Sequence, residues 1–126
     1  MSNIDNLTIN TLRFLSAEAI QKAKSGHPGL PLGAAPAAYT LWAKEMKVNP
    51  ANPNWDDRDR FVLSKGHCAP ALYGVLALRA FFPVEDVITF RSIDGHMSGH
   101  AEMRKINGID MSTGSLGQGV SAANGM

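Results

Sequence analysis

One short apolar run limits the folds that are open to this chain. Residues 60–64 read Arg-Phe-Val-Leu-Ser, and Gly66 ends the run. A short apolar segment of this kind suits a strand buried in a parallel sheet. The other periodic segments are helical, so the sequence predicts one clear strand among several helices. Because a single strand cannot satisfy its own edges, we expect an incomplete α/β domain over residues 1–126, with the rest of the sheet supplied from elsewhere.

Apolar residues at helical spacing predict the elements around that strand. We expect helices over residues 5–24, 32–46, 69–81 and 84–90, and a short helix of small residues after Leu116. The first helix should end at Ser25-Gly26, because glycine can take the positive φ that ends a helix. Pro36 is expected in the first turn of the second helix. Residues 91–113 show no sustained period and predict a long loop, which is often a functional feature.

Composition narrows the classes of partner and compartment. Charged residues make up 18% of the chain, against a usual figure of about 25%, so another chain or further residues should cover part of its surface. The net charge of +1 disfavours nucleic acid and anionic membranes as partners. Cys68 is the only cysteine, which excludes an internal disulfide and suits a reducing compartment, so we expect the cytoplasm. No basic stretch followed by an apolar run begins the chain, and no window reaches the roughly 20 apolar residues of a membrane span.

Each of the four histidines follows a glycine. The pairs are Gly26-His27, Gly66-His67, Gly95-His96 and Gly99-His100. A preceding glycine lets the backbone turn sharply and approach a ligand, so each imidazole can be delivered from a loop into a cleft. For the set as a whole, the pattern favours a shared site over four separate surface or core histidines.

Other chemistries fit these residues less well. His96 and His100 have the four-residue spacing of a helical zinc pair, but Gly95, Ser98 and Gly99 disfavour a helix. Met97 also stands where a glutamate base is needed. Cys68 follows His67, yet adjacent residues in a turn usually diverge, which disfavours a nucleophilic thiolate pair. The alternating charges of residues 56–60 are more simply helix-capping acids and solvated ion pairs than a substrate site.

A glycine-rich turn over residues 113–119 leads into the last helix. Such a turn can bring backbone groups close to a cofactor, and a helix N-terminus favours anions. Its glycines do not follow the dinucleotide-binding order, and no Gly-Lys-Ser/Thr follows, which excludes a nucleoside-triphosphate loop. Alone, the turn is equally consistent with a close-packed helix start.

Taken together, four ordered motifs resemble the N-terminal, diphosphate-binding part of transketolase. They are Ser-Gly-His-Pro-Gly with Pro-Leu-Gly at 25–33, Asp-Arg-Asp-Arg-Phe-Val-Leu-Ser with Gly-His at 57–67, Gly-His at 99–100, and Thr-Gly-Ser-Leu-Gly-Gln-Gly at 113–119. The last motif is closest to the shorter, split-chain transketolases. The resemblance implies a doubly wound thiamine-diphosphate-binding domain, of which this mostly helical chain would be the first portion. It also implies a place in the pentose phosphate pathway and a homo- or hetero-oligomer with the remaining transketolase domains or subunit.

The resemblance also implies roles for individual residues. His27 and His100 would be catalytic residues that contact the sugar phosphate substrate, and His67 would reach the diphosphate of the cofactor. Gly114, Ser115 and Leu116 would line thiamine diphosphate. Thiamine diphosphate supplies carbanion chemistry, while the protein orients the reactants and handles protons. Imidazoles are apt for that task, because they donate or accept protons near neutral pH.

The chain departs from the family pattern at three positions and lacks two of its parts. Ala101 and Ser115 each stand where many members have proline, and Lys65 stands where asparagine is frequent. The family's Gly-Asp-Gly motif, which binds Mg²⁺, and its activating glutamate do not occur in these residues, so the metal ligands are expected outside this chain. Two other functions stay open: a related transferase of the dihydroxyacetone synthase type, and a non-catalytic, truncated binding module.

Overall fold

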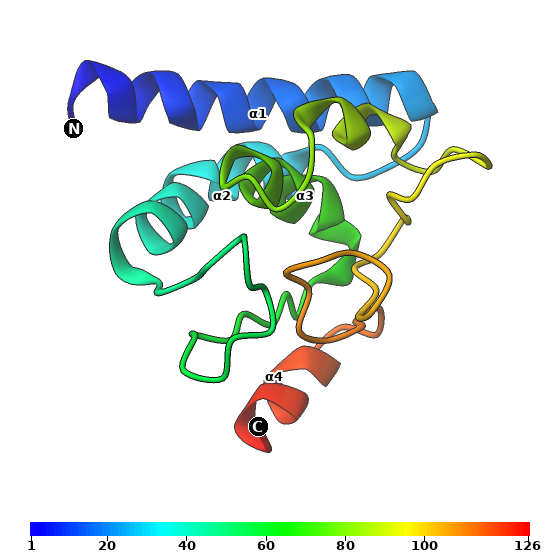
Figure 1. Cartoon of the computed structure of the whole chain (residues 1–126). Coiled ribbons are helices and arrows are strands. Elements are labelled where there is room, and N and C mark those ends of the chain that lie inside the picture. The colour runs from blue at the N-terminus through cyan, green and yellow to red at the C-terminus, as the bar shows by residue number, and fades with distance from the viewer.

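The computed structural model describes residues 1–126, and all of its regular structure is helical. The elements are α1 (Asn3–Ala23), α2 (Gly29–Thr40), the π-helix η1 (Leu41–Glu45), the 3₁₀ helix η2 (Gly66–Cys68), α3 (Ala69–Leu78), the 3₁₀ helix η3 (Val84–Thr89) and α4 (Gln118–Asn124). Figure 1 shows α1 running along one side of the molecule, α2 and α3 beneath it, and α4 at the opposite side. None of these helices combines the length and the apolar character needed to cross a membrane.

Residues 60–64 do not form the strand that their sequence predicts. The segment pairs with no other backbone. Instead, the N–H of Phe61 donates to Asp110 Oδ2 at 2.8 Å, and the carbonyl of Leu63 accepts from Thr113 Oγ1 at 2.6 Å. A strand is defined by the ladder it shares with a neighbour, and here side chains occupy the places of that neighbour. The expectation of one clear strand is therefore wrong, and these residues contain no sheet.

The first helix begins and ends through local interactions. Ser2 caps it, because its hydroxyl accepts from the N–H of Asp5 while the Asp5 carboxylate accepts from the N–H of Ser2. This reciprocal pair satisfies two free donors of the first turn. The helix ends slightly before the predicted stop, since Lys24 takes the left-handed conformation at φ 49°. Gly26 then turns the chain at φ 141°, where an added Cβ would lie 3.0 Å from the Ile20 side chain.

Pro36 lies inside α2 rather than in its first turn. The helix starts at Gly29, earlier than predicted, so Pro36 falls well past its first turn. A proline cannot donate to the carbonyl four residues earlier, which here belongs to Leu32. The Nε of Arg13 on α1 donates to that carbonyl at 3.0 Å. The proline is tolerated because a neighbouring helix supplies the missing donor.

The third helix forms the centre of the core. Pro70 lies near its start, as predicted, and every residue from Ala69 to Ala77 except Ala71 is buried. Side chains of α1, α2 and η3 pack around it, and Tyr73 and Leu76 have no exposed surface. The helix expected near residues 84–90 is the 3₁₀ helix η3, which begins directly after Pro83. An all-apolar helix such as α3 is stable only where others cover it on all sides.

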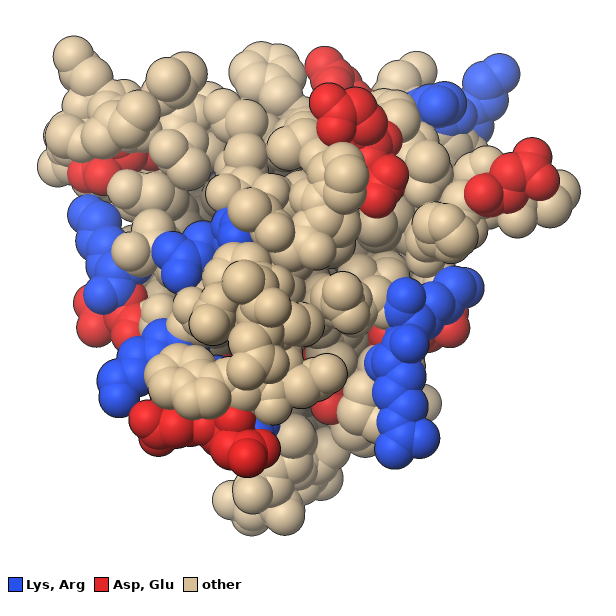
Figure 2. All heavy atoms as spheres, in the orientation of Figure 1, with Lys and Arg blue, Asp and Glu red and all other residues tan.

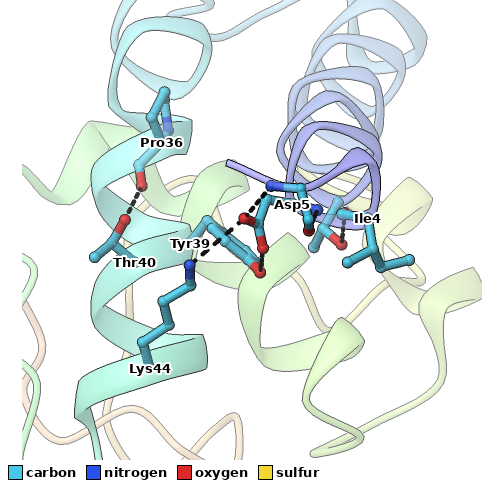
Figure 3. A network of polar contacts seen from close by, with 8 residues as sticks. Ile4, Asp5, Pro36, Tyr39, Thr40 and Lys44 are labelled. Carbon is cyan, nitrogen blue, oxygen red and sulfur yellow. Dashed lines mark hydrogen bonds and ion pairs between the residues drawn. The ribbon is translucent and has the colours of Figure 1, made fainter.

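A polar network ties the start of α1 to the end of α2. The hydroxyl of Tyr39 donates to Asp5 Oδ1 at 2.5 Å, and Lys44 Nζ lies 3.6 Å from Asp5 Oδ2 (Figure 3). The Tyr39 hydrogen bond is the largest of several contacts that lower the pKa of Asp5 to about 2. The same hydrogen bond raises the pKa of Tyr39. Asp5 is thus a buried carboxylate that is held charged by its partners.

Much of the molecular surface carries no charged side chains. In the view of Figure 2, Lys, Arg, Asp and Glu gather toward the edges of the face, and a broad uncharged area covers its middle. Large apolar side chains are exposed on α1, at Ile4, Leu7 and Phe14, and around α4, at Leu116 and Val120. Exposed apolar side chains on this scale are typical of surfaces that other protein covers.

Candidate functional site

Three of the four histidines meet in space. His27 lies in the turn between α1 and α2, His67 lies in η2, and His100 lies in the long loop that precedes α4. The ring centroids of His27 and His67 are 4.9 Å apart, with the rings at 61°. His100 is close enough for its charge to act on His67. The structure therefore brings together the three histidines to which the family resemblance gives a role, from segments up to 73 positions apart along the chain.

The surroundings of His67 keep its imidazole uncharged. Loss of solvent lowers the pKa of His67 below its ordinary value, and the charges of His27, His100 and Lys65 lower it further. Burial and like charges both disfavour the protonated form of a histidine. The neutral ring still has one N–H donor and one acceptor nitrogen. An anion that binds beside it would favour a second proton.

His96 does not belong to this cluster. It lines a separate hollow of about 180 Å³ together with Phe81, Phe82 and Asp86. Residues 95–100 are not helical, so the four-residue spacing does not place His96 and His100 on one face. No group of three or more His, Cys, Asp or Glu side chains is placed to hold a metal ion. The prediction of a site shared by all four histidines is therefore wrong, because His96 lies apart from the other three.

The glycine-rich turn reaches the cluster at Gly114. A Cβ added there would lie 4.0 Å from Cδ2 of His100 and would meet nothing nearer. Ser115 and Leu116 follow on the surface, and Leu116 is 72% exposed. The turn then passes through Gly117, at φ 89°, into α4. Gly114 and His100 are both exposed, so the space beside them is open to solvent.

Buried side chains that the sequence motifs did not single out hold the cluster in place. The hydroxyl of Tyr73 on α3 lies 2.8 Å from the carbonyl oxygen of Ser98 and 3.1 Å from that of His100, and it shares its proton between them. Burial raises the pKa of Tyr73, so it remains a donor. Tyr73 looks like any core aromatic residue of a helix in the sequence, because only the tertiary packing places the loop over it.

An ion pair beneath the surface fixes the segment that leads to His67. Arg58 Nη2 lies 2.5 Å from Asp110 Oδ1, and both side chains are largely buried. The other oxygen of Asp110 accepts from the N–H of Phe61. The interpretation of residues 56–60 as helix-capping acids and solvated ion pairs is thus wrong for Arg58. Asp59 accepts from the N–H of Lys47, which lies in the loop after η1 and not at the start of a helix. The partner Asp110 lies 52 positions away, so local charge patterning cannot identify it.

Cys68 is the last residue of η2, and it is buried, with 2% of its surface exposed. Loss of solvent is the main cause that raises the pKa of its thiol to about 11. A thiol with such a pKa carries almost no thiolate near neutral pH, and the thiolate is the reactive form. The geometry therefore assigns Cys68 a packing role. The neighbouring imidazole, that of His67, lies against His27 instead.

Comparison with known proteins places this arrangement in a family. The family described as "Transketolase, thiamine diphosphate binding domain" matches residues 4–126. The transketolase of Bacillus subtilis is 51% identical over 127 residues, covering 100% of this chain and 19% of that protein. The transketolase of Geobacillus stearothermophilus is 52% identical over 125 residues, covering 98% of this chain and 19% of that protein.

A solved structure extends the likeness to the fold. The transketolase of Campylobacter jejuni superposes with a TM-score of 0.92 at 44% identity, over 99% of this chain and 20% of that one. This chain spans about a fifth of the length of the relatives that it matches. Over that span its helices and loops have the arrangement of the relative. The chain therefore belongs to the transketolase family, in the part described as its thiamine diphosphate binding domain.

Proposed function

We propose that this chain supplies cofactor and substrate contacts to a transketolase, which transfers a two-carbon ketol unit from a ketose phosphate to an aldose phosphate. The observation that carries the proposal is the meeting of His27, His67 and His100 beside Gly114. Family membership supports the reaction type. The rest of the active site would come from residues outside these 126, since the chain spans 19% of its relatives' length.

The residues present fit an anionic cofactor. His67 is an uncharged donor that an adjacent phosphate would help to protonate, and Gly114 leaves room for close approach. We assign His67 to the diphosphate, and Gly114, Ser115 and Leu116 to the wall beside thiamine diphosphate. When bound, thiamine diphosphate provides the carbanion that cleaves and rejoins the carbon chain of the sugar. Each of these protein groups binds or orients the cofactor without taking part in bond changes.

His27 and His100 are assigned to the oxygens of the substrate. Each imidazole can donate an N–H to a carbonyl oxygen as negative charge develops there, and can accept a proton from a hydroxyl through its other nitrogen. Their positions on two different loops allow them to approach a sugar from two directions. Pairing with the sugar hydroxyls would also reject substrates that lack them, because the imidazoles would then be left without partners.

Magnesium would be held mostly by other residues. No suitable group of ligands is assembled here. Mg²⁺ usually combines one or two carboxylates with phosphate oxygens and water. We therefore place its protein ligands outside these 126 residues and derive no step from it. A cytoplasmic location and an oligomeric assembly complete the proposal, since the lone thiol suits a reducing compartment and much apolar surface is exposed.

The test compares histidines inside and outside the cluster in the complete enzyme. His27→Ala and His100→Ala should each lower kcat by about a hundredfold, the usual effect of losing a donor to a developing oxyanion, while the cofactor dissociation constant stays nearly unchanged. His96→Ala is the matched control and should leave both quantities unchanged. Loss of cofactor affinity with normal turnover would reverse the assigned roles. Activity on formaldehyde as the acceptor, in place of aldose phosphates, would indicate the dihydroxyacetone synthase type.

A further inference from the structure

Thr113 connects the three segments that meet at the site. It is buried and comes directly before Gly114. Its hydroxyl donates to the carbonyl of Leu63 at 2.6 Å, and its N–H donates to the carbonyl of Ala101 at 3.2 Å. Leu63 lies four positions before His67, and Ala101 directly follows His100. One residue thus joins the segments that carry His67, His100 and the glycine-rich turn.

The contact between Thr113 and the His67 segment is unusually close. A Cβ added to Gly66 would lie 2.5 Å from the carbonyl oxygen of Thr113 and 2.9 Å from its Oγ1. Gly66 is buried, so the backbone that carries His67 rests directly on Thr113. The carbonyl of Leu63 receives no hydrogen bond other than that of the threonine hydroxyl. A change in this hydroxyl would therefore be transmitted to the position of His67.

We propose that Thr113 is a positioning residue whose hydroxyl sets the distance between the segments of His67 and His100. Thr113 need not touch cofactor or substrate for this role. A hydrogen-bond donor contributes fully to the rate only when it is held close to its productive position. Misplacement by about 1 Å can lower the rate a hundredfold. The kinetic consequence rests on the proposed function, whereas the geometric consequence does not.

The geometric test uses diethyl pyrocarbonate, which acylates uncharged imidazole nitrogens, with the modified histidines located by mass spectrometry. Thr113→Val keeps the shape of the side chain and removes the donor, so the half-buried His67 should react severalfold faster while the exposed His96 keeps its rate. Thr113→Ser keeps the hydroxyl and should retain the wild-type pattern. Thr40→Val is the matched control, because the exposed Thr40 also donates to a backbone carbonyl, that of Pro36 at 3.0 Å, away from the site.

Each outcome of the labelling either supports or refutes the positioning role of Thr113. A wild-type rate at His67 in Thr113→Val would overturn the proposal. A loss of the helical circular dichroism signal would mean that the variant has lost its fold, and Thr113→Ser would then decide. In Thr113→Ser, a wild-type ratio of the His67 rate to the His96 rate would support the role of the hydroxyl. An altered ratio would assign the effect to the methyl group and refute the proposal.

A kinetic test in the complete enzyme separates this inference from the proposed function. At saturating cofactor, Thr113→Val should lower kcat about ten- to a hundredfold with little change in KM, and Thr113→Ser should restore it. A labelling change without any kinetic change would refute the proposed role of the histidine cluster and leave the positioning by Thr113 intact. Unchanged labelling with reduced kcat would refute the positioning instead.

Discussion

The imidazole of His67 lies against that of His27 and within reach of the charge of His100, and this crowding decides how it can meet an anion. Burial and neighbouring positive charges lower its pKa, so near neutral pH the free protein holds it uncharged. A bound phosphate would reverse that balance and favour the protonated ring. Cofactor binding should therefore be coupled to proton uptake at this residue.

The first prediction concerns the loss of that imidazole. In the complete enzyme, His67→Ala should weaken thiamine diphosphate binding by about 1.5 to 3 kcal/mol, roughly ten- to a hundredfold, because a charge-assisted hydrogen bond to phosphate is lost. The Michaelis constant for the sugar, measured at saturating cofactor, should change much less. His96→Ala serves again as the control. An unchanged cofactor dissociation constant in His67→Ala would remove His67 from the diphosphate site.

Among the elements, α1 and α2 are linked by one carboxylate. Asp5 accepts from Tyr39 and from the N–H of Ser2, and it lies near Lys44 (Figure 3). These contacts hold its pKa at about 2, against 3.8 for an ordinary aspartate. A carboxyl whose pKa is lower in the folded state stabilises that state above its unfolded pKa. The stabilisation is lost as the pH falls, because the unfolded chain takes up the proton first.

The second prediction follows from the lowered pKa of Asp5. The thermal midpoint of the chain, measured by circular dichroism, should fall between pH 4 and pH 2, the window between the unfolded and folded values of about 3.8 and about 2. Asp5→Asn should have a lower midpoint at pH 6 and a flatter fall in that window. Asp94→Asn, which changes an exposed carboxyl in the long loop, is the control and should follow the wild type. Equal slopes for Asp5→Asn and the wild type would show that another carboxyl is responsible.

Sequence patterns located the helices better than the extended segment. Periodicity predicts α1, α2 together with η1, and α3 to within a few residues, although the last turns of the second helix are π-helical. An amphipathic or apolar helix can be predicted in this way because it satisfies its own backbone. The Pro36 expectation was wrong, since a distant side chain, Arg13, satisfies the carbonyl that the proline leaves free. Residues 60–64 have the composition of a strand, but a strand requires a partner, and none of these 126 residues provides one.

At the scale of the whole molecule, large apolar side chains are exposed at both ends of the chain. Ile4, Leu7 and Phe14 on α1 are more than half exposed, as are Leu116 and Val120 near α4. An apolar groove of about 290 Å³ also opens between α2, α3 and the segment before His67, lined by residues such as Leu30, Leu41 and Leu63. Exposed apolar surface of this extent is typical of sites where other protein binds.

The third prediction applies to residues 1–126 purified alone. The chain should self-associate and should show neither transketolase activity nor magnesium-dependent binding of thiamine diphosphate. His67 and the backbone near Gly114 can attract an anion, but an open site with no assembled metal ligands leaves the diphosphate exposed to water and screening salt. Calorimetric titration with cofactor and magnesium, beside light scattering, makes the measurement. A saturable, magnesium-dependent heat at micromolar affinity would show that the cofactor site is complete in this chain.

The sequence by itself determined the features that depend on neighbours along the chain: the main helices, the long loop over residues 91–113, and the four glycine-histidine pairs, three of which meet at the candidate site. Only the tertiary structure decided that His27, His67 and His100 meet while His96 lies apart. It alone revealed the supports at Tyr73 and Thr113, which act across 25 to 50 positions. The reason is physical: helix formation and chain reversal are governed by contacts within a few residues, whereas the distance between two loops depends on how the whole core packs.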